Sequence, residues 1–177
     1  MRKASARLYA LLSPVRLTDS TVSGNYASVI GGGVYAKQSS TVTVSNTIVS
    51  GNTATTGSDL YSASSSVSPT YSLMGTTLDA LPYNDPGNNN IFSDSPGLGA
   101  LGPNGGPTLT MALSDNSPGL NAGDPLLAVD PTTVLPLKYD QRGPGFPRTL
   151  PDGTVDIGAY QHKGTDRISA NGFESGP

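Results

Sequence analysis

The chain has 177 residues and a formal net charge of −3, and it contains no cysteine. A cysteine-free chain has no disulfide framework, thiol nucleophile or cysteine-based metal site. The few basic residues form no stripe, so we expect no nucleic-acid partner. No apolar stretch approaches the roughly 18 residues of a membrane span, so we expect no transmembrane segment.

A repeat runs through the N-terminal half. The tripeptide Leu-Tyr-Ala at residues 8–10 returns as Val-Tyr-Ala at 34–36 and as Leu-Tyr-Ser at 60–62, at steps of 26 residues. A longer phrase at 17–25 returns at 44–52, a step of 27. Glycine, proline and serine make up a third of the chain, which without a period is typical of disorder. A fixed period of this size instead indicates a repeat architecture.

The first 80 residues have the pattern of short strands. Small polar and apolar β-branched residues alternate over 41–45, and a second apolar stretch at 47–50 precedes the turn residues Gly51 and Asn52. Glycines 31–33 allow a bend before the strand at Val34. We therefore predict an all-β fold, with a right-handed parallel β-helix of about three coils over residues 1–80. A β-sandwich is the alternative, but its successive units do not repeat in sequence.

Stacked coils lie about 4.8 Å apart and bury an apolar face that no single coil buries alone. Residues one period apart should therefore contact each other, and stacked asparagines should form an amide ladder. The residues expected to stack are Val22 on Val49, Leu8 on Val34 and Leu60, and Asn25 on Asn52.

The sequence repeat ends near residue 81. Clusters of Pro, Gly and Asn separate isolated apolar pairs, so we predict an irregular C-terminal cap over 81–163 that closes the end of the solenoid. Residues 164–177 are expected to be a flexible tail, a remnant of a sorting signal. The start of the chain is interpreted as a truncated repeat. Its apolar run, Leu8 to Leu12, is shorter than the roughly 7–15 residues of a signal peptide and is in phase with the repeat.

Four phrases in the second half occur together in a fixed order. They resemble the C-terminal region of bacterial choice-of-anchor Q proteins, which are exported right-handed β-helix proteins carrying one of several sorting tails. The repeats upstream resemble those of polymorphic outer-membrane proteins. The resemblance implies an extracellular or cell-surface location and an adhesin-like role. The four phrases are 104–113, 117–124, 140–143 and 156–160.

The chain departs from the family pattern at two positions. Met111 stands where the family has His, and Gln161 stands where it has Glu. Family members also carry more coils upstream, so the resemblance implies that this is the C-terminal part of a longer protein. Upstream coils of the same protein are therefore an expected partner. Residues 168–174 are similar to short terminal phrases of some exported proteobacterial proteins.

The strongest polar constellation is Asp140, Arg142 and Asp156. Arginine presents five donors in a fork, so Arg142 is predicted to tie carboxylates and loop carbonyls together as a structural hub. The alternative is a carboxylate pair with an arginine that orients a substrate. A long irregular segment needs such donors for its backbone carbonyls, which favours the hub.

An oxygen-rich cluster offers the one candidate metal site. Asn and Asp also favour turns, and no calcium-binding loop spacing is present, so a turn is the favoured interpretation and Ca²⁺ the alternative. No other cofactor is expected. The candidate ligands are Asp85, Asn88, Asn90 and Asp94.

The repeated tyrosines Tyr9, Tyr35 and Tyr61 have two interpretations. Their strict register favours a structural aromatic stack, and a carbohydrate-stacking surface is the alternative. His162, the single histidine, is expected at the surface, which leaves no Ser-His-Asp arrangement.

The sequence favours a non-catalytic structural or adhesive module, with a polysaccharide or surface glycan as a further expected partner. The alternative is a carbohydrate-active β-helix, such as a polysaccharide lyase or glycosidase, with its catalytic coils upstream. Such enzymes need acidic or basic groups beside the scissile bond, and the aligned repeat positions share no charge. A groove holding two nearby carboxylates would favour the enzyme, whereas a bare Ser and Thr surface would favour the adhesin.

Overall fold

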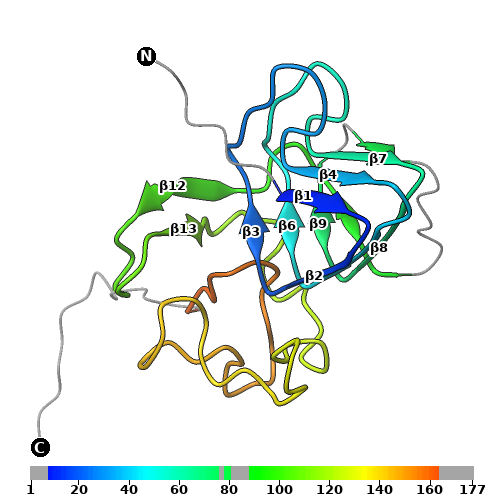
Figure 1. Cartoon of the computed structure of the whole chain (residues 1–177). Coiled ribbons are helices and arrows are strands. Elements are labelled where there is room, and N and C mark those ends of the chain that lie inside the picture. Colours follow the sequence, from blue (N-terminus) through cyan, green and yellow to red (C-terminus); the bar gives the residue numbers. More distant parts are fainter. Residues whose placement is uncertain (1–7, 76–77, 81–87, 164–177) are drawn as a thin grey trace, which may run out of the picture.

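The computed structural model describes residues 8–75, 78–80 and 88–163 (Figure 1). All regular secondary structure in these residues is β-strand, so no described helix is long and apolar enough to cross a membrane. The strands are β1 (Leu8–Leu11), β2 (Pro14–Thr18), β3 (Thr21–Val22), β4 (Val34–Lys37), β5 (Thr41–Ser45), β6 (Ile48–Val49), β7 (Leu60–Ala63), β8 (Ser66–Thr70), β9 (Leu73–Met74), β10 (Leu78–Ala80), β11 (Ile91–Phe92), β12 (Leu98–Gly102) and β13 (Thr110–Leu113).

Strands β1 to β11 form three parallel sheets. Their orders are β1-β4-β7-β10, β2-β5-β8 and β3-β6-β9-β11. Any three successive strands from β1 to β9 therefore lie in three different sheets. Tyr9 pairs with Tyr35 and Tyr35 with Tyr61, which is the register expected from the sequence period. The predictions of an all-β fold and of parallel strands at this period are confirmed. We call residues 8–33, 34–59 and 60–77 the first, second and third units.

The core lies between the three sheets because side chains alternate along each strand. In β5, Val42 and Val44 are fully buried, while Thr41 and Thr43, which alternate with them, point outward. The fully buried Val34 and Leu60 lie beside each other in the register, as expected. The equivalent apolar residues of the first unit are only half-buried, because β1, β2 and β3 are edge strands among the described residues. These half-buried residues are Leu8, Val15, Leu17 and Val22.

Side-chain oxygens continue the hydrogen bonding at the bend between the second and third strands of each unit. The Ser20 N–H donates to Oγ1 of Thr47 at 3.2 Å, and the Thr47 N–H donates to Oγ of Ser72 at 3.2 Å. The Ser72 N–H donates to Oδ1 of Asn90 at 2.9 Å. Each bend donor is therefore paired with an acceptor one unit further along the chain, and we call this series the bend ladder.

A second series lies after the third strand. Nδ2 of Asn25 donates to Oδ1 of Asn52 at 3.0 Å, so the expected contact between these two amides is present. Nδ2 of Asn52 in turn donates to Oδ1 of Asp59 at 3.0 Å. A Cβ on Gly75 would lie 1.8 Å from Oδ2 of Asp59, so glycine is needed where the third unit passes this carboxylate.

The third unit is shorter than the first two. Leu78 pairs with Leu60 and Ile91 with Leu73, which are steps of only 18 residues. Long loops follow β3 and β6, whereas only three residues of sequence separate the end of β9 from the start of β10. The parallel pairing also continues past residue 80 into β11, beyond the boundary expected from the sequence.

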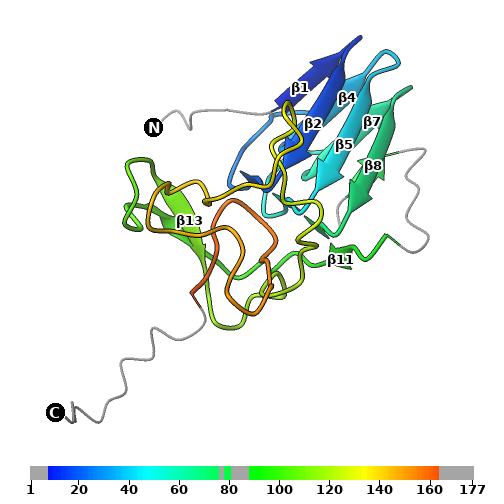
Figure 2. The same ribbon diagram turned by 90° about the horizontal axis from the view of Figure 1, so that it is seen from below.

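The second half packs along the side of the stack, whereas the sequence suggested a cap at its end. It contains the antiparallel hairpin β12–β13 and, over residues 114–163, an irregular segment. Figures 1 and 2 show this segment beside the stacked strands, mostly in yellow and orange. Ile157 and Leu113 pack against Ile48 of the second unit and Leu73 of the third. A Cβ on Gly158 would lie 2.8 Å from Cδ1 of Ile48, so the close approach requires glycine there.

The bend ladder predicts a specific loss of stability in Thr47→Val. The substitution keeps the side-chain shape but leaves the Ser20 N–H without its acceptor. We expect the free energy of unfolding in urea to fall by about 1–3 kcal/mol. Thr43→Val is the matched control on the outward face of β5, and it should change stability by no more than about 0.5 kcal/mol. Equal effects of the two substitutions would show that the ladder adds nothing.

Candidate binding pocket and buried ion pairs

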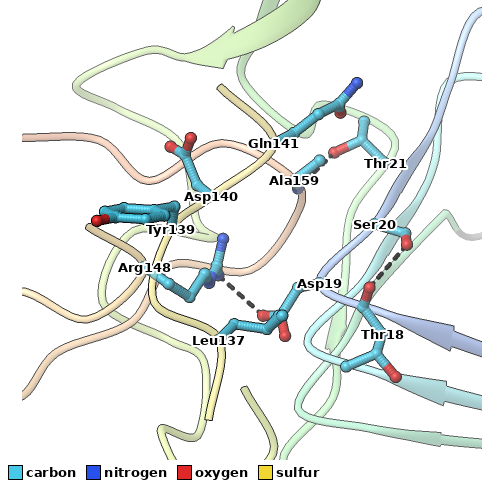
Figure 3. A pocket seen from close by; sticks show the side chains of 10 residues that line it. All are labelled: Thr18, Asp19, Ser20, Thr21, Leu137, Tyr139, Asp140, Gln141, Arg148 and Ala159. Carbon is cyan, nitrogen blue, oxygen red and sulfur yellow. Dashed lines mark hydrogen bonds and ion pairs between the residues drawn. The ribbon is translucent and has the colours of Figure 1, made fainter. Parts of the chain in front are cut away.

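A pocket of about 450 Å³ lies where the first unit meets the irregular segment. One wall comes from the bend between β2 and β3, and the other from residues 137–141 with Arg148 and Ala159. Figure 3 shows Tyr139 and Asp140 on one side and Thr18 and Ser20 on the other. The lining residues are Thr18, Asp19, Ser20, Thr21, Leu137, Tyr139, Asp140, Gln141, Arg148 and Ala159.

Asp19 reaches this site because of the bend that it occupies. Its φ of 46° is left-handed, as are those of Asn46 at 46° and Tyr71 at 49°, the residues that follow β5 and β8. Aspartate and asparagine adopt this conformation more readily than most residues. Asn46 accepts a hydrogen bond from the Asp124 N–H at 2.9 Å, and its amide donates back to the Asp124 carbonyl at 2.8 Å. In the first two units the bend thus directs a short polar side chain at the irregular segment.

A buried ion pair joins Asp19 to Arg148. Nη2 of Arg148 lies 3.1 Å from Oδ1 of Asp19, and the two side chains are 0% and 4% exposed. The guanidinium also donates to the carbonyl of Gly158 at 2.7 Å and to the carbonyl of Asp156. Arg148 therefore connects the first unit to two positions of the irregular segment.

Burial dominates the protonation of Asp19. It raises the pKa of this carboxyl to about 6, against the lowering effects of the Arg148 charge and the Asn46 amide. The amide is near enough to lower the pKa, but neither Asp19 oxygen accepts a well-formed hydrogen bond from a described residue. Burial also raises the pKa of Asp156, although backbone donors from Asn121 and His162 oppose it.

A second buried pair joins Asp140 to Arg142, two of the three residues expected to form the hub. Nη2 of Arg142 lies 2.6 Å from Oδ2 of Asp140 and 2.6 Å from the carbonyl oxygen of Gln161. The guanidinium carbon lies 3.8 Å from the ring centroid of Tyr160 and 4.0 Å from that of Phe146. Arg142 is thus held by a carboxylate, a carbonyl and two aromatic faces.

Asp156 has other partners. Its carboxylate accepts hydrogen bonds from the backbone N–H groups of Asn121 at 2.7 Å and His162 at 2.5 Å. Gln161 links it to the Asp140 pair: Oε1 of Gln161 accepts from the Asp156 N–H at 2.9 Å, and the Gln161 N–H donates to Asp140 at 2.8 Å. The structure therefore brings Asp140 and Arg142 together, and it connects Asp156 to this pair only through Gln161.

The sequence interpretation missed Asp19, Arg148 and Gln161. A signal for Asp19 was present, because it is one of only two charged residues between Leu17 and Ser58. No comparable signal marks Arg148, whose role depends on how the irregular segment folds back. Gln161 was noticed only as a departure from the family pattern.

The three repeated tyrosines lie in contact. The ring centroids of Tyr9 and Tyr35 are 5.1 Å apart, and those of Tyr35 and Tyr61 are 5.5 Å apart. Tyr35, the middle ring, is only 8% exposed, whereas Tyr9 is 46% exposed. A sugar ring thus has access to the end of this stack but not to a continuous aromatic strip.

The calcium candidates serve other contacts where they are described. Nδ2 of Asn90 donates to the Pro69 carbonyl at 3.0 Å while Oδ1 ends the bend ladder, and the Asn88 carbonyl accepts from the Tyr71 N–H at 2.8 Å. Asp94 is exposed, and Asp85 lies outside the described residues. Within the described ranges, no three His, Cys, Asp or Glu residues are grouped to hold a metal ion.

His162 lies at the rim of the irregular segment. Its side chain is 23% exposed, and Nε2 lies 3.1 Å from Oδ1 of the exposed Asp115. It is not among the residues that line the pocket.

Comparison with protein-family models, with curated proteins and with solved structures gives no match for this chain.

The Arg142 pair predicts that Arg142→Ala is strongly destabilising. The substitution leaves the buried Asp140 carboxylate without its cation and removes the packing on two rings. We expect a loss of about 3 kcal/mol or more in urea unfolding. Arg16→Ala, which removes an exposed arginine of β2, is the control and should stay within about 0.5 kcal/mol. An Arg142→Ala protein as stable as its parent would show that the pair is not structural.

The raised pKa of Asp19 predicts a pH-dependent difference between the wild-type chain and Asp19→Asn. The carboxyl binds its proton more tightly when folded, with a pKa of about 6 against 3.8 unfolded. The stability of the wild type relative to Asp19→Asn should therefore rise by about 3 kcal/mol as the pH falls from 7 to below 4. Urea unfolding at several pH values measures this difference.

Asp130→Asn is the control of opposite sign. Backbone donors from Thr133 and Thr132 lower the pKa of Asp130. Its ionised form is thus favoured in the folded state, and the stability of the wild type relative to Asp130→Asn should fall as the pH drops below 3.8 and through the lower pKa of the folded state. A pH-independent difference for Asp19→Asn would contradict the role given to burial.

Proposed function

We propose that this chain is a non-catalytic structural or adhesive module of an exported bacterial protein, and that its three sheets form a right-handed parallel β-helix. The in-register sheets, with each unit contributing one strand to each, support the β-helix. The resemblance of the second half to choice-of-anchor Q proteins supports export to the cell surface.

The observation that carries the proposal is the outward face of the β2-β5-β8 sheet. Every outward position of β5 and β8 carries a hydroxyl group, and these residues pair across the two strands. We call this surface the hydroxyl face. These six hydroxyl groups carry no charge and suit contact with a neutral glycan, because they offer hydrogen bonds without the cost of desolvating charges. The exposed Arg16 of β2 pairs with Thr43 and borders this surface. Its residues are Thr41, Thr43, Ser45, Ser66, Ser68 and Thr70.

The end of the stack suits a further unit of the same protein. Four apolar residues of the first unit are half-buried, and among the described residues the strands β1, β2 and β3 have a parallel neighbour on one side only. The equivalent surface of the second unit is covered by the first. A preceding unit with the same pattern would pair its strands here in the same register.

One observation favours the alternative of a carbohydrate-active enzyme. Asp19, with its pKa of about 6, lines the same pocket as Asp140, and paired carboxylates in different environments are typical of glycosidases. Both carboxylates are, however, paired with buried arginines. A general acid must reach the glycosidic oxygen, and Asp19 is 4% exposed.

Co-sedimentation with insoluble neutral polysaccharides tests the proposal. The wild-type chain should bind at least one of them without releasing new reducing ends or unsaturated products. The double variant Thr43→Glu/Ser68→Glu places two charges on the hydroxyl face and should abolish binding. Thr132→Glu, at an exposed position of the irregular segment, should not. Product release that is lost in Asp19→Asn would instead establish the enzyme, and equal binding by the double variant would remove the hydroxyl face from the site.

A further inference from the structure

We propose that the pocket between the first unit and the irregular segment binds a single neutral sugar residue. This inference rests on the proposed glycan-binding function and assigns it a specific subsite. The pocket volume of about 450 Å³ lies within the range of small-molecule sites, which is about 300–1,000 Å³.

The walls offer the two kinds of contact that a sugar ring needs. Tyr139 lines one side and is 44% exposed, and its aromatic ring is the group that would stack against the C–H face of a pyranose. Thr18 and Ser20 line the opposite side of the pocket (Figure 3). Gln141 also lines the pocket, and its Nε2 donates to the Leu109 carbonyl at 3.4 Å. Hydroxyl and amide groups both donate and accept, which matches the hydroxyl groups of a sugar.

The charges around the pocket select a neutral ligand. Its ionisable lining groups are Asp19, Arg148, Tyr139 and Asp140. Asp19 and Arg148 pair with each other at 3.1 Å, and Asp140 pairs with Arg142 at 2.6 Å. Because both carboxylates are compensated by buried guanidinium groups, neither a phosphate or uronate nor an ammonium group finds an unpaired counter-charge there.

The pocket is continuous with the hydroxyl face. Thr18, the last residue of β2, pairs with Ser45 of β5, which in turn pairs with Thr70 of β8. Thr18 also lines the pocket. A polysaccharide that lies across the hydroxyl face can therefore place a terminal residue against Tyr139, so the pocket recognises a chain end.

The test is an NMR titration of the complete chain with the methyl glycosides of glucose, galactose, mannose and N-acetylglucosamine. At least one should bind at millimolar concentration and shift the backbone amides of Ser20, Gln141 and Ala159. Tyr139→Ala should weaken that binding about tenfold, whereas Tyr139→Phe, which keeps the ring, should retain it. Tyr26→Ala removes another exposed tyrosine outside the pocket and should have no effect. Glucuronate and glucosamine should bind more weakly than the neutral sugars.

Three results would contradict the proposal that this pocket binds a sugar. These are the absence of shifts with all four glycosides, shifts confined to residues outside the pocket, and unchanged affinity in Tyr139→Ala. Gln141→Ala provides a second variant if Tyr139→Ala does not give a folded spectrum, and it too should weaken binding. Co-sedimentation with polysaccharides but no shifts in the pocket would leave the proposed adhesive function standing and remove this subsite. Shifts in the pocket without co-sedimentation would support the sugar subsite and contradict the proposed adhesive function.

Discussion

The structure depends on finding acceptors for backbone donors at the bends of each unit. Along the strands, the parallel ladder pairs these groups automatically, but at a bend the chain changes direction and the ladder stops. Ser20, Thr47 and Ser72 resolve this at one bend, because the side-chain oxygen of each later residue accepts the N–H of the residue one unit before it. An oxygen is needed at the same place in every unit. The bend therefore favours Ser, Thr and Asn at this place, whether the step is 27 residues, as from Ser20 to Thr47, or 18, as from Ser72 to Asn90.

The second half satisfies its backbone in another way. Residues 114–163 contain no strand of the named sheets, and their carbonyl groups are bound in part by arginine side chains. Arg148 donates to Gly158 and Asp156, and Arg142 donates to Gln161. Guanidinium groups buried in this way need carboxylates beside them, and these are Asp140 for Arg142 and Asp19 of the first unit for Arg148.

The repeat period predicted the register of β1, β4 and β7 because identical residues one period apart must occupy equivalent places. The lateral packing of the second half was not predicted, although two dipeptides carried a signal for it. Ile48 and Val49 are adjacent, point to opposite faces of β6 and are both fully buried, as are Leu73 and Met74 in β9. Two consecutive buried apolar residues in a strand require cover on both faces. The identity of that cover depends on contacts between distant segments, which no local pattern encodes.

The candidate site is a consequence of the same bends. The left-handed residue after the second strand projects outward, and in the first two units it is Asp19 and Asn46. The neutral Asn46 binds the backbone of Asp124 through its own donor and acceptor. Asp19 has acceptors only, so at the equivalent place it requires a cation, and Arg148 supplies it. A single difference between two equivalent bends therefore replaces a backbone contact with a buried ion pair. That pair lines a pocket whose carboxylates are compensated by arginine, at the junction of the regular and irregular halves.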